Sequence, residues 1–201
     1  MRQAKGPPKT SSRRPGRPRS STVDAALSAA VIEILASDGY EGLRVDDVAE
    51  RAGVSKTTLY RRAPSKAALV VDVLRGLKHD HVPLPDTGDI ASDLRSLVRD
   101  LYRSLDGTAL GRALAGLLAE KDRDPELTEA IEQLWHSRQQ QVGSVIRRGI
   151  DAGTIRPGLD EASLVEFLAG PAYYRLLVTG QRLDPASATR HADALVAAVV
   201  R

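Results

Sequence analysis

Hydrophobic residues recur at steps of three and four along most of the chain, which is the spacing of one face of a helix. In the first such stretch the repeat passes through Val23, Leu27, Val31 and Ile34. No segment alternates apolar and polar residues over the length of a strand, so the sequence predicts an all-α fold. Helices are expected over residues 21–39, 45–52, 56–62, 65–77, 90–105, 108–121, 124–153, 160–179 and 184–201.

Two breaks divide this pattern into three parts. Residues 1–20 are rich in Lys, Arg, Pro, Gly and Ser, so a disordered basic arm is expected there. Residues 81–88 include Pro83 and Pro85 and predict a loop. The sequence thus predicts an N-terminal helical domain over residues 21–80 and a larger helical domain over residues 81–201.

Composition narrows the class of protein. The 201 residues are 42% hydrophobic and 27% charged, a balance that allows a sizeable core. The chain has no cysteine, which excludes a disulfide framework, a thiolate zinc site and a cysteine nucleophile. No apolar run approaches the roughly 18 residues that span a bilayer, so we expect a soluble, cytoplasmic protein.

The charge is unevenly distributed along the chain. Residues 1–20 carry seven basic side chains and no acidic one, whereas residues 21–201 carry 22 basic and 26 acidic side chains. A basic tail on a mildly acidic body predicts a polyanionic partner. The tail has no hydrophobic face to insert into lipid, so nucleic acid is favoured over a membrane surface.

The most informative motif is RVDDVAERAGVSKTTLYRRAPSK at residues 44–66. Two short helices meet there at Gly53, a residue type that accepts the backbone conformation of a tight turn. Val48, Val54 and Leu59 are spaced to pack between the two helices. This is the layout of a helix-turn-helix, whose second helix enters the major groove of DNA.

The outward face of that second helix is cationic and hydroxyl-bearing, with no carboxylate. On a helical wheel it lies opposite Leu59. Its members are Lys56, Thr57, Tyr60 and Arg61, with Thr58 on the flank. An ordinary helix hairpin with a solvated charged face is the alternative, but the basic tail and the acid-free face favour DNA contact.

Residues 21–77 resemble the N-terminal domain of TetR-family transcriptional regulators. The matching segments are SDGY at 37–40, the helix at 45–52, VSKTTLY at 54–60 and PSK at 64–66. The resemblance implies a DNA-binding domain at residues 21–80. The predicted DNA-binding residues are Arg44, Ser55, Lys56, Thr57, Thr58, Tyr60, Arg61 and Lys66. Three positions depart from the family pattern: Arg44 replaces a capping Ser or Thr, Ala63 a large aromatic, and Ala68 a Glu.

Within the basic arm, RPGRPR at residues 14–19 resembles an AT-hook. Proline keeps the backbone extended, and arginine suits the narrow minor groove of A·T tracts. The candidate minor-groove residues are Arg14, Arg17 and Arg19. The alternative is a solvated basic tail that adds only nonspecific affinity.

The C-terminal part carries GPAYYRLLVTG at residues 170–180, which resembles a Gly-Pro-x-Tyr-Tyr-Arg stretch in one subset of the family. The resemblance implies a homodimer through about residues 161–201 and a small-molecule effector. The alternative is that the last helix completes the monomer core. Pro171 predicts a kink or a helix restart. The candidate ligand-pocket residues, for each of which core packing is the alternative, are Tyr102, Trp135, His136, Tyr173 and Tyr174.

No feature predicts a metal, a cofactor or catalysis. The run His79-Asp80-His81 has no further ligand cluster, so no metal site is expected. No GxSxG, P-loop, GxGxxG or HExxH signature is present, so no enzyme is expected. The sequence therefore predicts a dimeric, sequence-specific DNA-binding regulator, in particular a repressor relieved by an effector. An architectural protein that coats A·T-rich DNA is the alternative, and an all-α enzyme is the rival outside DNA binding.

Overall fold

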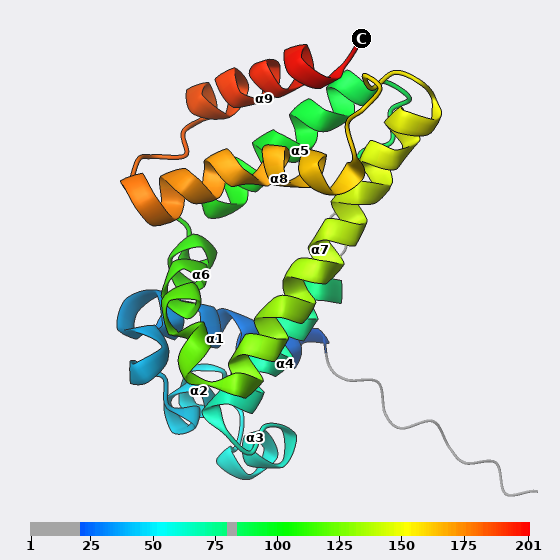
Figure 1. Ribbon diagram of the computed structural model, residues 1–201. Helices are drawn as coiled ribbons and strands as arrows, with labels where there is room; N and C mark the ends of the chain where they lie inside the picture. The colour runs from blue at the N-terminus through cyan, green and yellow to red at the C-terminus, as the bar shows by residue number, and fades with distance from the viewer. Residues whose placement is uncertain (1–20, 80–83) are drawn as a thin grey trace, which may run out of the picture.

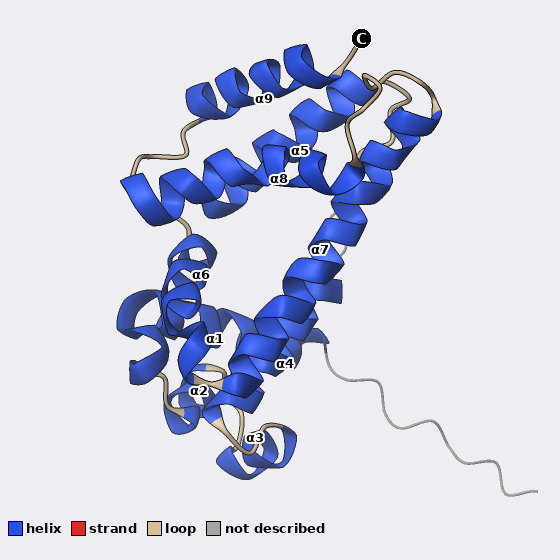
Figure 2. Ribbon diagram, viewed as in Figure 1, coloured by secondary structure: helices blue, strands red, loops and turns tan. Residues whose placement is uncertain are grey.

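The structure, a computed structural model, describes residues 21–79 and 84–201. Over these ranges the regular elements are helical (Figure 2), apart from one antiparallel bridge between Ile155 and Val200, and the predicted all-α fold is confirmed. Of the described helices, none combines the length and apolar composition that a membrane span needs. The α-helices are α1 Ser21–Gly42, α2 Val45–Arg51, α3 Lys56–Arg62, α4 Lys66–His79, α5 Ile90–Leu105, α6 Ala109–Glu120, α7 Pro125–Asp151, α8 Glu161–Tyr174 and α9 Pro185–Val199.

Helix boundaries follow local chemistry. At most helix starts a side-chain oxygen accepts a backbone N–H of the first turn, which satisfies a donor that has no partner within the helix. These capping residues are Ser55, Asp89, Thr108, Asp124, Asp160 and Asp184. Gly53, with φ of 65°, forms the turn between α2 and α3 as predicted, because glycine adopts positive φ without a Cβ clash.

The helices, whose arrangement Figure 1 shows, pack around two hydrophobic cores. The first joins α1–α4 to α6 and to the N-terminal half of α7, and the second joins α5, α8, α9 and the rest of α7. Helix α6 takes part in both, since Leu117 lies in the first core and Leu114 in the second. Packing therefore crosses the boundary near residue 80, and the N-terminal helices rest directly on α6 and α7.

A buried polar contact reinforces this junction. Tyr40 lies near the C-terminal end of α1. Its hydroxyl donates a hydrogen bond of 2.7 Å to Asp124, the N-cap of α7. Burial, together with this contact, raises the pKa of Tyr40 well above its ordinary value. The same hydrogen bond is the main cause that lowers the pKa of the Asp124 carboxyl.

Pro171 lies inside α8, which continues to Tyr174, so the helix does not restart at that residue. Proline lacks the N–H that would bond the carbonyl of Phe167 one turn earlier. His191 of α9 supplies the missing donor, with its Nε2 at 3.2 Å from that carbonyl oxygen. The helix changes from α to π geometry only beyond Tyr174, where Arg175–Thr179 form a π-helical turn that ends at Gly180.

Candidate DNA-binding surface and ligand cavity

Helix α3 is anchored by its inward face. Leu59 is fully buried between the neighbouring helices, as the helical wheel predicts. Ser55 caps the helix by accepting the backbone N–H of Thr58 at 3.2 Å, and the two hydroxyl oxygens lie 2.7 Å apart. The Thr58 hydroxyl is thus held by the cap, while its neighbours on α3 stay exposed.

An arginine clamp, which the sequence did not predict, orients α3 against the helices behind it. Arg62 donates from Nε to the Asp72 carboxylate of α4 at 2.6 Å and pairs through Nη1 with Asp24 of α1. The three side chains are about one-third exposed, so solvent weakens each pair. Their joint effect is geometric, because one guanidinium links α3 to both α1 and α4.

The outward face of α3 is exposed as predicted. Lys56, Thr57, Tyr60 and Arg61 are all open to solvent, and none of them is covered by the described part of the chain. One carboxylate nevertheless borders the face, since Asp46 of α2 pairs with Lys56 at 2.7 Å. The hydrogen bond from Lys56 is the main cause that lowers the pKa of Asp46. The helical wheel could not predict this pair, because a wheel describes α3 alone.

The predicted residues at the edges of this surface differ in their surroundings. Arg44 is exposed at the N-cap of α2 and makes no capping hydrogen bond. Lys66 lies with its Nζ 4.3 Å from the ring centroid of Tyr40 and 3.7 Å from the Glu41 carboxylate. Among the residues that the structure describes, Lys66 therefore has partners within the protein and Arg44 has none. The candidate arm residues Arg14, Arg17 and Arg19 lie outside the described residues.

A cavity of about 520 Å³ lies among α5, α6, α7 and α8. It has the size of a small-molecule site. Trp135 and Tyr173, both predicted to line a pocket, stand in its wall with ring centroids 5.2 Å apart in an edge-to-face arrangement. Leu84 and Pro85, on the connection between α4 and α5, complete one side of it.

Three other predicted pocket residues do not line this cavity. Tyr102 is buried in the second core beside His191, 5.7 Å between ring centroids. His136 is exposed and bonds to Gln140 at 2.9 Å, and Tyr174 is largely exposed on α8. Aromatic type alone selected them, whereas the direction of each helix face decides which side chains reach the cavity. Sequence reasoning missed Arg138 and the leucines of α5 and α6, which do line it.

Comparison with known proteins decides the family. The profile of the "Bacterial regulatory proteins, tetR family" matches residues 27–73, and that of the "Tetracyclin repressor-like, C-terminal domain" matches residues 84–195. The chain belongs to the TetR family of transcriptional regulators. It is 32% identical over 170 residues to the HTH-type transcriptional regulator YdeS of Bacillus subtilis, covering 84% of this chain and 85% of that protein.

Further relatives agree with the TetR assignment along most of the chain. The DNA-binding transcriptional repressor TetR of Mycobacteroides abscessus is 30% identical over 188 residues, covering 91% of this chain and 96% of the other. The crystal structure of the TetR-family regulator SCO0332 superposes with a TM-score of 0.70 at 35% identity, covering 90% of this chain and all of that one. The predicted function of a DNA-binding transcriptional regulator is thereby confirmed.

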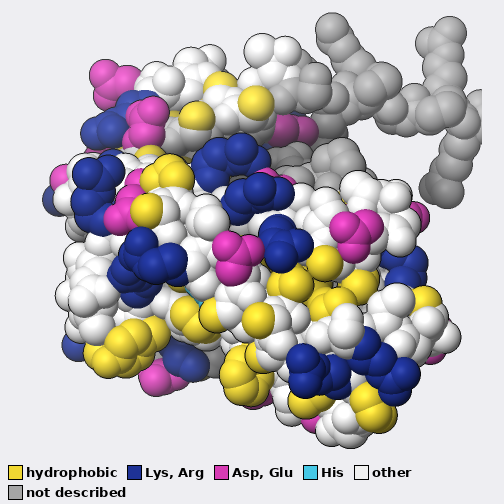
Figure 3. All heavy atoms as spheres, turned by 90° about the horizontal axis from the view of Figure 1, so that it is seen from above, with side chains coloured by type: hydrophobic (Ala, Val, Ile, Leu, Met, Phe, Trp, Pro, Cys, Tyr) yellow, Lys and Arg dark blue, Asp and Glu magenta, His cyan; other side chains and the backbone are white. Residues whose placement is uncertain are grey.

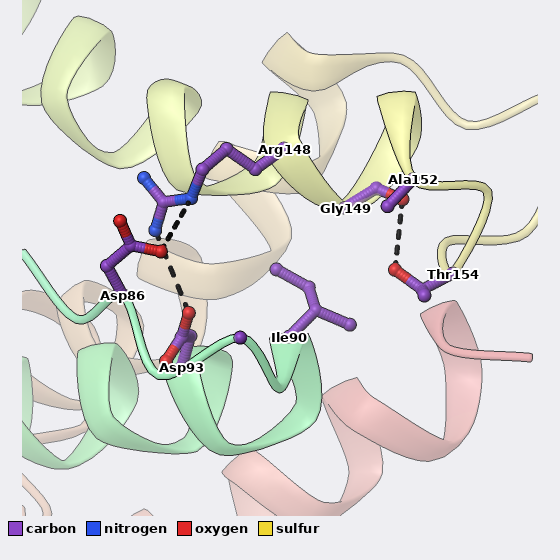
Figure 4. A pocket seen from close by; sticks show the side chains of 8 residues that line it. Asp86, Ile90, Asp93, Arg148, Gly149, Ala152 and Thr154 are labelled. Atoms are coloured by element: carbon purple, nitrogen blue, oxygen red, sulfur yellow. Dashed lines mark hydrogen bonds and ion pairs between the residues drawn. The ribbon is translucent and has the colours of Figure 1, made fainter.

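In this TetR-family chain, the connection from α4 to α5 is fastened to α7 (Figure 4). Arg148 of α7 donates to the Pro85 carbonyl oxygen at 2.6 Å and lies 3.4 Å from Asp86. It also lies 3.7 Å from the buried carboxylate of Asp93, which accepts a hydrogen bond from Thr87. The contacts surround a pocket of about 180 Å³ and hold one wall of the larger cavity against α7.

The exposed apolar side chains of this TetR-family protein concentrate on α8 and the turn after it. Those on α8 and this turn are Phe167, Tyr174, Leu177 and Val178. The sequence left open whether α9 serves a homodimer or completes the monomer core. Leu195, Val196 and Val199 pack in the monomer's own second core. At the end of the molecule remote from α3, hydrophobic and charged side chains lie interleaved (Figure 3).

No metal cluster forms among residues 21–79 and 84–201, where no three potential ligands gather. Asp80 and His81 of the run His79-Asp80-His81 lie outside the described residues.

Proposed function

We propose that this protein is a repressor that binds a near-palindromic operator as a homodimer and leaves it when a small molecule occupies the cavity. The observation that carries the DNA-binding part is the outward face of α3. It is cationic, hydroxyl-bearing and exposed, and it is held by Leu59 on the inside and by the Arg62 clamp at its end. A helix presented in this way can reach base edges and phosphates in the major groove.

The homodimer part rests on the apolar face of α8. Phe167 is 65% exposed and Val178 is 69% exposed, and they lie on the same stretch as Tyr174. Large side chains exposed this far, and gathered on one element, mark an interaction surface. We assign it to a second copy, with α8 and α9 of both chains in the interface. Two copies would present two α3 helices to half-sites about one helical turn apart.

The effector part rests on how the cavity is connected to the DNA-binding domain. Helix α6 carries Leu110, Leu114 and Leu118 in the cavity wall and Leu117 in the core shared with α1. A ligand that moves the wall therefore acts on the element against which α1 packs. To regulate DNA binding, it must favour one arrangement over the other by roughly 1–3 kcal/mol.

The DNA-binding proposal is tested with fragments selected from genomic DNA by the purified full chain. Replacing Lys56, Thr57, Tyr60 and Arg61 together by Ala removes the outward face of α3. We expect loss of specific binding in fluorescence anisotropy, because each base or phosphate contact contributes roughly 1–3 kcal/mol. Arg103→Ala, an exposed change on α5, is the control and keeps wild-type affinity. Specific binding that survives the fourfold change would assign DNA recognition to another surface.

We also propose that the basic arm adds minor-groove contacts beside each half-site. Deleting residues 1–19 removes the candidate residues Arg14, Arg17 and Arg19. We expect weaker binding and a smaller slope of log K against log salt, by roughly 0.9 for each phosphate that the arm neutralises. An unchanged slope for the shortened chain would contradict a role of the arm in DNA binding.

A further inference from the structure

The cavity has an apolar wall on one side. Helix α5 contributes Leu97, Leu101 and Leu105, and α6 contributes Leu110, Leu114 and Leu118. A ligand that fills this space must therefore bring a hydrophobic body, since burying apolar surface is the main gain available along this wall.

The side of the cavity formed by α7 and α8 offers hydrogen-bond donors. Arg138 and Trp135 of α7 and Tyr173 of α8 all line it. The Tyr173 hydroxyl and the Trp135 indole N–H have no hydrogen-bond partner among the described residues, although both side chains are partly buried. Burial raises the pKa of Tyr173 to about 12, so its hydroxyl keeps its proton at neutral pH and remains a donor.

Arg138 lacks a counter-ion within the part of the chain that the structure describes. Its one hydrogen bond is a long contact of 3.4 Å from Nη1 to the side-chain oxygen of Gln141. It forms no ion pair with the two carboxylates that also line the cavity, because Asp100 pairs with Arg103 instead and Glu166 stands at an exposed position of α8. A partly buried guanidinium without a carboxylate favours an anion from outside.

We propose that the effector is an amphipathic acid: a hydrophobic body on the leucine wall, and an anionic head that accepts hydrogen bonds from Arg138 and Tyr173. This inference rests on the proposed function, because it names the chemical class of the ligand that the cavity takes. The head belongs near the Trp135–Tyr173 pair, and the body extends toward α5 and α6.

Ligand binding at this site can be followed by intrinsic tryptophan fluorescence, since Trp135 is the only tryptophan of the chain and lines the cavity. The ligands for the test are decanoic acid, decanol and decylamine, which share one hydrophobic body and differ in the head group. At neutral pH the acid is an anion and the amine a cation. Titration of the full chain, followed by tryptophan fluorescence, gives a Kd for each.

Decanoate is expected to bind at least roughly tenfold more tightly than decanol, the advantage of a charge-assisted hydrogen bond. Decylamine is expected to bind more weakly than both. Equal or tighter binding of decylamine would assign the head-group site to Asp100 and Glu166 and overturn the proposal. Failure of all three to bind would overturn it as well, because a decyl body would then not fit the leucine wall.

Two variants locate the anion site. In Arg138→Met the preference for decanoate over decanol is expected to vanish, while decanol keeps its Kd within about threefold. Arg99→Met is the matched control, since Arg99 is exposed on α5 outside the cavity and donates its hydrogen bond to Ser96, and it keeps the preference. Retained preference in Arg138→Met contradicts the proposal. Because the comparison of three ligands needs no substitution, the proposal stays testable if that variant folds poorly.

The outcomes also separate this inference from the proposed function. If decanoate binds through Arg138 but DNA binding never responds to any cavity ligand, effector control fails and the assignment of the ligand class stands. If DNA is released by a ligand that has no acidic group and does not need Arg138, effector control stands and the ligand class is wrong.

Discussion

The α3 surface and the ligand cavity differ in polarity, in exposure and in how the chain forms them. The α3 surface is polar and exposed, and one buried leucine and one arginine clamp hold it in place. The cavity is lined mainly by apolar side chains, and helices from four places in the sequence enclose it. The two sites meet through α6, α7 and the Tyr40–Asp124 hydrogen bond. A surface for a large rigid partner can thus be set by one short helix, whereas a small-molecule site depends on how distant elements pack.

The strongest test of this contrast uses adjacent residues of α3. Leu59→Ala is expected to lower the free energy of unfolding by roughly 2–5 kcal/mol, because Leu59 is fully buried and the change leaves a cavity. Tyr60→Ala is expected to change it by less than about 0.5 kcal/mol and to weaken DNA binding instead. Urea unfolding and anisotropy measure the two effects. Similar losses of stability in both variants would contradict the inward and outward assignment.

A second test addresses the C-terminal part. Phe167→Glu puts a charge on the exposed apolar face of α8 and is expected to weaken the homodimer at least roughly tenfold, because the carboxylate would be desolvated in the interface. Light scattering should give a monomeric mass for this variant and a dimeric mass for the wild type. Val23→Glu, a similar change at an exposed position of α1, serves as the control and stays dimeric. A wild type that is itself monomeric at micromolar concentration refutes the dimer.

The smallest expected effect concerns the junction between the two regions. Tyr40→Phe removes the hydrogen bond to Asp124 and is expected to cost about 1 kcal/mol at neutral pH. The folded-state pKa of Asp124 is lowered, so its contribution is present above the unfolded value near 4 and is lost as the pH falls through the folded pKa. The stability difference between wild type and variant should therefore be constant near neutral pH and shrink as the pH falls below about 4.

Urea unfolding at a series of pH values measures this effect. Tyr60→Phe is the control, since Tyr60 is exposed on α3, and it should match the wild type at every pH. If wild type and Tyr40→Phe differ in free energy of unfolding by the same amount at every pH, the Tyr40–Asp124 hydrogen bond does not depend on the charge of Asp124.

Much of the fold is predictable because it depends on neighbouring residues. The Asp124 and Asp184 caps and the turn at Gly53 mark element boundaries in the sequence itself. The outward face of α3 follows from helix periodicity. Contacts between elements gave no such signal: Asp46 reaches Lys56 from another helix, and His191 bonds the carbonyl that Pro171 leaves free.

The cavity, too, depends on contacts between elements that the sequence pattern does not predict. Its leucines have the spacing of any buried helix face, so periodicity cannot separate a cavity wall from a filled core. Tyr102 and Trp135 are both aromatic residues on predicted helices, yet one fills the second core and the other lines the cavity. Only the packing of α5, α6, α7 and α8 decides between these roles.

The central claim is that two α3 helices of one dimer grip a single duplex. A hydroxyl-radical footprint of the wild type on a fragment selected from genomic DNA tests it most directly. We expect two protected tracts related by a dyad, with centres about one helical turn apart. Protection that grows in proportion to fragment length, as an architectural protein would give, or a single tract without a symmetry mate, would contradict it.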